Sequence, residues 1–202
     1  MSQAAPRIRL ATAEDAESIR AIYAPVVAGT AISFEVEPPN APEMRRRLVE
    51  TLARTPWLVC AAAGVGVAQE FAGPHRARPA YQWSVDVSVY VDARARRAGV
   101  ACALYTSLFP LLALQGFCAA YAGITLPNPA SVGLHESLGF RPVGVYRAVG
   151  YKLGAWHDVG WWELALRPRP AEPRAPVDLA TARRMAGWEA ALAAGLPRLR
   201  PR

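Results

Sequence analysis

Arginines crowd the junction between a predicted strand and a predicted helix, and they indicate an anion-binding turn. In "RARRAGVACALY" (94–105), Arg96 and Arg97 precede Gly99 and several small residues, after which apolar residues recur at helical spacing. The first N–H groups of a helix lack partners within the helix, and with the helix dipole they attract anions. Glycine allows a ligand close to the backbone. The segment therefore predicts a pyrophosphate cradle, with a solvated surface turn as the alternative.

Three ionisable side chains outside this turn could transfer protons. Asp86 lies in the middle of "WSVDVSVYV" (83–91), where strand alternation places it on a polar face with two serines and a tyrosine. Burying a carboxylate is costly, so Asp86 indicates a cleft, or else a nearby arginine partner. His135, in a short predicted helix, and Tyr105, in the helix after the cradle, are the other candidates. Core packing is the alternative role for both.

Apolar periodicity and helix-cap signals predict the elements that position these residues. The expected strands cover 7–11, 57–63, 65–73, 81–91, 116–126, 140–150 and 158–166, and the expected helices cover 12–27, 41–55, 100–115 and 129–139. An additional extended piece is expected within 29–38, and Gly64 should form the turn of a hairpin. The order is near βα(α)ββββαβαββ, which predicts a mixed α/β fold with helices flanking one sheet.

The net charge of +7 gathers at the C-terminal end. Residues 167–202 hold eight arginines and three acidic residues, whereas residues 1–166 are nearly balanced. We therefore expect residues 1–170 to form the folded domain. Residues 171–202 should form a Pro/Arg-rich linker followed by a lone amphipathic helix within 177–195. This tail should be solvated and dispensable, and an arm for RNA or a membrane surface is the alternative.

Cysteine usage and hydropathy narrow the class of protein. Cys60, Cys102 and Cys118 each lie in an apolar run and fit reduced thiols better than disulfides. No His/Cys spacing suggests a metal site, and no apolar window approaches the roughly 20 residues that span a bilayer. The N-terminus lacks a signal-peptide core. These features favour a cytoplasmic protein without a metal, and we expect neither nucleic acid nor a membrane as its partner.

Several longer stretches resemble one enzyme family. "RRAGVA" (96–101) resembles the Gln/Arg-x-x-Gly-x-Gly/Ala signature of the GNAT acetyltransferase superfamily. Five further stretches are similar to the phosphinothricin N-acetyltransferases, namely "SFE" (33–35), "GPHRARPAYQWSVDVSVYV" (73–91), "ALYTSL" (103–108), "LPNPASVGLHESLGF" (126–140) and "GYKLGAWHDVGWWEL" (150–164). The resemblance covers roughly residues 7–170. It implies a GNAT fold, whose central mixed, mostly antiparallel sheet is splayed at the cofactor site and flanked by helices, and it implies a homodimer.

The same resemblance implies acetyl-CoA as co-substrate. The strand before the cradle would hydrogen-bond the pantetheine arm, as an added strand would. The cradle would wrap the pyrophosphate, and a helix-capping asparagine would lie near the thioester. The implied cofactor contacts are Val89, Tyr90, Val91, Arg96, Arg97, Ala98, Gly99, Val100, Ala101, Cys102 and Asn128.

Amide formation from an amine and a thioester needs a deprotonated amine, a stabilised carbonyl oxygen and a proton for the departing thiolate. By resemblance, Asp86 and His135 act together on the amine. A backbone N–H near Tyr90 would meet the oxygen, and Tyr105 would protonate the thiolate. The family has glutamate where Asp86 stands, so the shorter side chain should act through a bridging water.

The implied reaction is acetyl transfer to the α-amine of a small amino-acid-like substrate, by direct attack in a ternary complex. The implied substrates are phosphinothricin and compounds of the methionine sulfone or sulfoximine type, whose anionic groups suit arginine. The implied substrate contacts are Phe34, Glu35, Arg76, Arg78 and Tyr81. Two alternatives stay open. One is a non-catalytic acyl-CoA-binding module that acts as a sensor or scaffold, and the other is an enzyme for peptide or protein amines.

Overall fold

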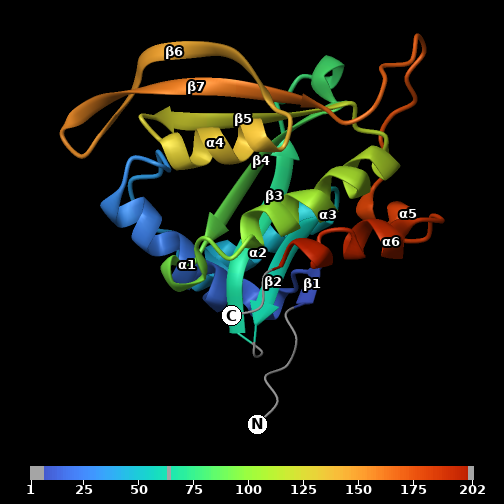
Figure 1. The fold of residues 1–202 in the computed structure, drawn as a ribbon, viewed down its shortest axis with the longest axis horizontal. Coiled ribbons are helices and arrows are strands. Elements are labelled where there is room, and N and C mark those ends of the chain that lie inside the picture. Colours follow the sequence, from blue (N-terminus) through green and yellow to red (C-terminus); the bar gives the residue numbers. More distant parts are fainter. Residues whose placement is uncertain (1–6, 63–64, 200–202) are drawn as a thin grey trace.

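Seven strands form a single sheet in the computed structural model of the chain, which describes residues 7–62 and 65–199 (Figure 1). The spatial order is β1-β2-β3-β4-β5-β7-β6, and within the described residues β4 and β5 are the only parallel neighbours. The strands are β1 (Arg7–Leu10), β2 (Trp57–Ala62), β3 (Val65–Pro74), β4 (Ser84–Val91), β5 (Ala119–Leu126), β6 (Arg141–Lys152) and β7 (Ala155–Ala165). The mixed, mostly antiparallel sheet expected from the sequence is confirmed.

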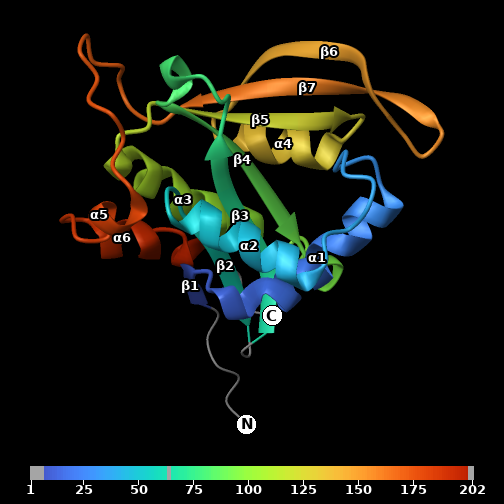
Figure 2. The ribbon, with the colours of Figure 1, turned by 180° about the vertical axis from the view of Figure 1, so that it is seen from behind.

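Helices cover both faces of the sheet (Figures 1 and 2). One face carries α1 (Ala16–Gly29) and α2 (Ala41–Leu52), and the other carries α3 (Val100–Gln115) and α4 (Pro129–Ser137). Each pair of helices buries apolar side chains against the strands, so the sheet separates two hydrophobic cores. Side chains on the two faces of the sheet therefore enter different cores.

Cap residues explain where these helices begin. Asn40 Oδ1 accepts the N–H three residues further on at 2.9 Å, and Asn128 Oδ1 accepts that of Ser131 at 3.1 Å. Thr12 and Asp15 form a capping box at the short 3-10 turn that leads into α1. Each asparagine or threonine thus satisfies N–H groups that the helix leaves without partners. The helix starts expected at Asn40 and Asn128 are confirmed, whereas Thr12 opens a 3-10 turn and α1 begins only at Ala16.

Successive residues of β4 belong to different cores. Val85 and Val87 are buried in the cluster that includes α3, whereas Tyr90 packs against the cluster of α1 and α2. Because side chains alternate along a strand, Asp86 and Ser88 lie on the same face as Tyr90. The polar face expected from the sequence is therefore the α1/α2 face of the sheet.

Three details of the chain differ from expectation. The segment 30–40, which precedes α2, contains bends and no strand, and three strands rather than the four of the expected order lie between α2 and α3. The strand expected at 81–91 begins at Ser84, because Pro79–Tyr81 form a 3-10 turn whose proline cannot donate to a ladder. The hairpin turn expected at Gly64 lies outside the described residues.

The C-terminal segment is folded onto α3. It forms two short helices, α5 (Leu179–Ala182) and α6 (Trp188–Ala193), in place of the single helix expected within 177–195. Gly187, with φ +91°, separates them, because a left-handed residue cannot continue a helix. The expectation of a lone helix is wrong, whereas the domain boundary near residue 170 stays a prediction.

Hydrogen bonds and apolar burial join this segment to α3. Trp188 is 3% exposed and belongs to the same core cluster as Leu104 and Leu108 of α3. Ser107 Oγ donates to the carbonyl oxygen of Leu192 at 2.7 Å and accepts the N–H of Gly195 at 3.1 Å. The expectation of a solvated tail is therefore wrong, because the segment packs on the fold, whereas its dispensability for activity stays a prediction.

Replacing Trp188 by alanine should lower the free energy of unfolding by about 3–5 kcal/mol, because it opens a large cavity against α3. Urea denaturation followed by circular dichroism measures the change. Met185→Ala is the matched control, because Met185 lies in the same segment but is 39% exposed. Equal stability of Trp188→Ala and the parent chain would show that the segment does not stabilise the fold.

Candidate active site

The parallel strands β4 and β5 open into a wedge. They pair only between Ser84–Asp86 and Ala119–Tyr121, although β4 continues to Val91 and β5 to Leu126. Beyond Asp86, β4 keeps its ladder with β3, and β5 keeps its ladder with β7. The facing edges therefore present N–H and C=O groups that the sheet does not use. An extended ligand can pair with such an edge as an additional strand.

A groove of about 980 Å³ extends along the end of β4 and the start of α3. Of the cofactor contacts expected from the sequence, the structure brings together ten as lining residues, namely Val89, Tyr90, Val91, Arg96, Arg97, Gly99, Val100, Ala101, Cys102 and Asn128. Ala98 instead packs against the main core. Val26 of α1 and Leu134 of α4 also line the groove, and sequence patterns alone gave no signal for either. The binding roles of these residues stay a prediction.

The turn between β4 and α3 has an unusual backbone. Arg97 has φ +62° and Gly99 has φ +77°, and left-handed conformations of this kind are costly for residues other than glycine. Gly99 caps α3, so the first N–H groups of the helix face outward without helical partners. Arg94 is held by an ion pair to Asp92, whereas Arg96 and Arg97 are exposed. The turn thus combines free donors and positive charge at one helix end.

Tyr105 of α3 and His135 of α4 form a buried pair at the wedge. Tyr105 Oη lies 2.9 Å from His135 Nε2, and His135 Nδ1 lies 2.8 Å from the carbonyl oxygen of Ser131. A carbonyl oxygen only accepts, so Nδ1 carries the imidazole proton and Nε2 accepts from the tyrosine hydroxyl. Burial lowers the pKa of His135 and raises the pKa of Tyr105 well above its usual value. Both groups are therefore uncharged at neutral pH.

Asp86 lies on the other face of the sheet from this pair. Its Oδ1 is 2.5 Å from Nδ1 of His75, and its Oδ2 is 4.0 Å from Arg76. Burial raises the pKa of Asp86, and the contacts with His75 and Arg76 oppose that rise. The resemblance implies that Asp86 and His135 act together, whereas strand alternation and the two cores place them on opposite faces of the sheet. Their joint role stays a prediction.

The family model described as the acetyltransferase (GNAT) domain matches residues 8–161. The chain belongs to the GNAT acetyltransferase family. The splayed strands, the groove and the turn at Gly99 are thus parts of a GNAT fold, and the resemblance stated from the sequence is confirmed.

Relatives of this GNAT chain include acetyltransferases that are named for small-molecule substrates. It is 42% identical over 170 residues to the phosphinothricin N-acetyltransferase of Streptomyces viridochromogenes, covering 82% of this chain and 93% of that protein. It is 33% identical over 169 residues to the L-methionine sulfoximine/L-methionine sulfone acetyltransferase of Pseudomonas aeruginosa, covering 82% and 98%. A phosphinothricin acetyltransferase from Sinorhizobium meliloti, solved with acetyl-CoA, superposes with a TM-score of 0.80 at 31% identity, covering 84% and 93%.

Two of the expected substrate residues of this acetyltransferase lie near Asp86. The guanidinium of Arg76 lies over the ring of Trp161 at 5.4 Å, and the ring of Tyr81 lies 5.9 Å from that of His75. Arg78 precedes the 3-10 turn and is exposed. The loop between β3 and β4 therefore gathers cationic and aromatic groups around the carboxylate.

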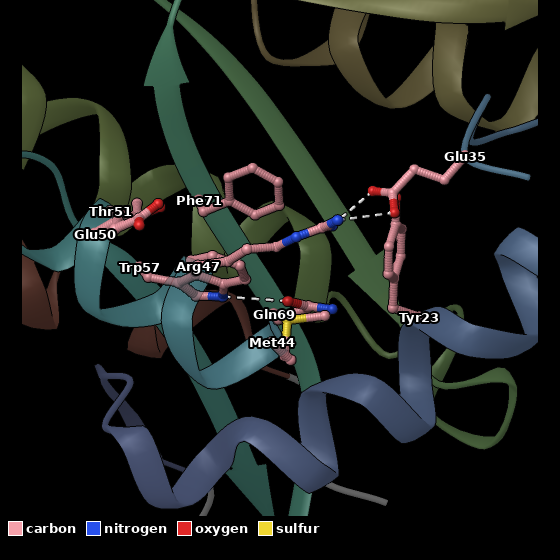
Figure 3. Close-up of a pocket in the computed structure, with 9 residues that line it drawn as sticks. All are labelled: Tyr23, Glu35, Met44, Arg47, Glu50, Thr51, Trp57, Gln69 and Phe71. Atoms are coloured by element: carbon pink, nitrogen blue, oxygen red, sulfur yellow. Dashed lines mark hydrogen bonds and ion pairs between the residues drawn. The ribbon is translucent and has the colours of Figure 1, made fainter. Parts of the chain in front are cut away.

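Phe34 and Glu35 diverge from each other and do not join this cluster. Phe34 lies against the β6–β7 hairpin, with its ring 6.2 Å from that of His157. Glu35 accepts hydrogen bonds from Tyr23 at 2.8 Å and from Arg47 at 2.7 Å. Figure 3 shows this ion pair across the mouth of a cavity of about 280 Å³ between α2 and strands β2 and β3. Glu35 is thus already engaged in a salt bridge within the chain.

Sequence reasoning missed the aromatic surroundings of Asp86. His75 stacks on Tyr121 with ring centroids 4.4 Å apart, and Trp161 meets its edge at 5.9 Å. Tyr121 and Asp86 are paired residues of β5 and β4, whereas Trp161 comes from β7. Only the pairing of distant strands brings these side chains together, so no local pattern could have shown it.

Replacing Tyr105 by phenylalanine should lower the free energy of unfolding by about 1–3 kcal/mol, because the buried Nε2 of His135 loses its donor. Urea denaturation measures the loss, and Tyr146→Phe is the matched control, since Tyr146 is 50% exposed. A Tyr105→Phe protein as stable as the parent would contradict the hydrogen bond between the two helices.

Proposed function

We propose that the chain transfers the acetyl group of acetyl-CoA to the α-amine of a small amino-acid-like substrate. The phosphinothricin and methionine sulfoximine/sulfone acetyltransferases among its relatives support this substrate class. The observation that carries the proposal is the wedge between β4 and β5, which opens directly beside the anion-binding turn at Gly99. One groove thereby offers both a strand edge and a phosphate site.

The groove fits acetyl-CoA chemically. The free edge of β4 from Val87 to Val91 suits the amide groups of the pantetheine arm. The first N–H groups of α3, with Arg96 and Arg97, suit the pyrophosphate. When bound, acetyl-CoA supplies the activated acetyl thioester. The solved Sinorhizobium relative, which contains acetyl-CoA, supports the same assignment.

The chain's own groups divide the proton transfers between the two faces of the sheet. Tyr105 is the proposed donor to the leaving sulfur, and its O–H must first turn away from His135 Nε2. His135 holds that hydroxyl in place and can exchange the proton with it. Asp86, on the other face, serves the amine, and a β4 backbone N–H near Tyr90 meets the developing negative charge on oxygen.

The loop between β3 and β4 selects the acceptor in this proposal. Arg76 lies beside Asp86, where its guanidinium can bind the carboxylate of an amino acid and thereby bring the α-amine toward the proton acceptor. Tyr81 extends the same surface through its contact with His75, and Arg78 stands beside it in the loop. Phe34 lies apart, against the β6–β7 hairpin, and its contact with the acceptor stays an expectation from the resemblance. Glu35 acts through its ion pair with Arg47, which holds the segment before α2.

Purified protein mixed with acetyl-CoA should release coenzyme A thiol with phosphinothricin, methionine sulfone or methionine sulfoximine, measured by a thiol-reactive dye. Binding of acetyl-CoA without turnover on any amino acid would favour a sensor module, and turnover on peptides alone would favour a peptide acetyltransferase.

Gly99→Ala should weaken acetyl-CoA binding by roughly tenfold or more in calorimetry, because a Cβ strains the left-handed backbone and occupies space in the cradle. Gly29→Ala is the matched control, since a Cβ there meets nothing within 4 Å.

We also propose that two copies associate through the β6–β7 hairpin. β6 is an edge strand, and the hairpin exposes large apolar side chains, with Tyr151 61% and Trp156 66% exposed. Exposed apolar surface of this kind is typical of a protein interface. Because Phe34 packs beside this hairpin, such an interface would border the acceptor site.

Light scattering should therefore give twice the chain mass of 21.8 kDa. Trp156→Glu should shift the protein toward the single-chain mass, because a charge cannot be buried at an apolar interface without a partner. Arg20→Glu, on the exposed surface of α1, is the control. A parent protein with the mass of a single chain at micromolar concentration would contradict the proposed association.

A further inference from the structure

His75 holds a position at Asp86 that the proposed function leaves without a role. Its Nδ1 lies 2.5 Å from Asp86 Oδ1, so one ring nitrogen is occupied by the carboxylate. Its Nε2, on the far side of the ring, has no hydrogen-bond partner among the described residues. The side chain is 15% exposed, so the ring is held by the protein and is still open to a ligand.

The ring is fixed in orientation by its neighbours. Tyr121 stacks on one face with an interplanar angle of 23°, while Tyr81 and Trp161 meet it edge-on. These contacts come from three separate elements, so the imidazole cannot turn without disturbing β5, β7 and the loop before β4. A ring held in this manner presents one nitrogen in a constant direction, as proton transfer requires.

The pair of His75 and Asp86 lies at a defined point of the sheet. Asp86 and Tyr121 are the last paired residues of β4 and β5, so the pair lies at the closed end of the wedge. Val87 and Ser88, the next residues of β4, already line a cavity of about 60 Å³ inside the wedge. Asp86, which holds the imidazole, thus directly precedes the β4 residues along which a bound thioester would meet the acceptor amine.

We propose that His75 is the catalytic base of the reaction, and that Asp86 is the positioning residue that holds its Nδ1–H. The inference rests on the proposed function and names the group that removes the proton from the acceptor amine. It replaces the water expected to bridge the short aspartate to the amine with a side chain of this chain. An aspartate that orients a histidine and stabilises its protonated form is a well-understood arrangement in hydrolases.

The proton balance of the step is complete. The acceptor ammonium gives one proton to His75 Nε2, and its nitrogen then bonds to the acetyl carbon while the carbon–sulfur bond breaks. The sulfur keeps the bonding pair and takes a proton from Tyr105. The second proton lost by the nitrogen returns the Tyr105–His135 pair to its starting state, and the proton on His75 leaves to solvent. The products are the N-acetylated amine, coenzyme A thiol and one proton.

Charged and titratable groups face His75 from several elements. Asp86 of β4 contacts its Nδ1, and the guanidinium of Arg76 lies 4.0 Å from the Asp86 carboxylate. Tyr81 and Tyr121 are the titratable groups that face the ring, and Glu163 and Arg169 interact with the Tyr121 hydroxyl. A base acts in its unprotonated form, so kcat/KM of the parent protein should rise with pH, and this rise should require the His75 side chain.

The test is a pH profile of kcat/KM for the full chain with acetyl-CoA and the best amino-acid acceptor. His75→Gln should lower kcat/KM by roughly 10²- to 10⁴-fold, the usual scale for a general base, and should remove the rise with pH. Asp86→Asn should cause a similar loss, because an amide N–H donates to Nδ1 and leaves Nε2 protonated. The double variant should be no slower than the slower single variant, because the two residues act as one unit.

Two further measurements distinguish the loss of a catalytic group from a disturbed fold. Added imidazole should restore activity to His75→Ala, which a merely structural role would not allow. His157→Gln is the matched histidine control, and it should keep the parent rate and pH profile. Each variant should bind acetyl-CoA with the parent affinity, which shows that the site is assembled.

The outcomes distinguish this inference from the proposed function. If the parent protein turns over an amino acid while His75→Gln keeps both its rate and its pH profile, the inference fails and the acetyltransferase proposal stands. The same holds if His135→Ala, and not His75→Gln, removes the rise with pH. If the parent protein turns over no amine, the proposed function fails, and this inference fails with it.

Discussion

The loss of pairing between β4 and β5 after Asp86 is the constraint on which the rest of the site depends. Two parallel strands that start in register and then separate leave backbone donors and acceptors in the middle of a sheet. Such groups are costly to leave without partners when they are shielded from water. The fold therefore leaves backbone N–H and C=O groups unpaired in the middle of its sheet, and a ligand with amide groups can hydrogen-bond to them. The strained turn at Gly99 lies at the open end of the same strand and adds the anion site.

The wedge also separates the acidic and basic steps of the chemistry in space. Tyr105 and His135 reach it from the α3/α4 side, and Asp86 with His75 reaches it from the α1/α2 side. A donor and an acceptor that touched each other would simply exchange the proton between themselves. The sheet prevents this, so each group can keep the protonation state that its own step requires.

Much of this architecture could be predicted from the sequence, because it is encoded locally. Asn40 and Asn128 cap helices, alternation in β4 gives a polar face, and the residues around Gly99 give a helix start with free N–H groups. The contacts that the sequence could not predict depend on pairing between strands that are far apart in the chain. The contact of His75 with Asp86 and Tyr121 and the separation of His135 from Asp86 are of this kind. The sequence also did not indicate that the C-terminal segment packs on α3, because its proline-rich start and its arginines are typical of a solvated tail.

The attachment of that segment to α3 determines where the chain can be truncated or joined to a fusion partner. The family match ends at residue 161, yet buried side chains up to Ala191 belong to the main core. A boundary drawn from homology alone would therefore remove one wall of the helix that carries both the cradle and Tyr105. Tags or fusion partners are better tolerated beyond residue 199 than in place of this segment. In this chain the outer surface of α3 thus carries a stabilising piece that lies outside the matched family region.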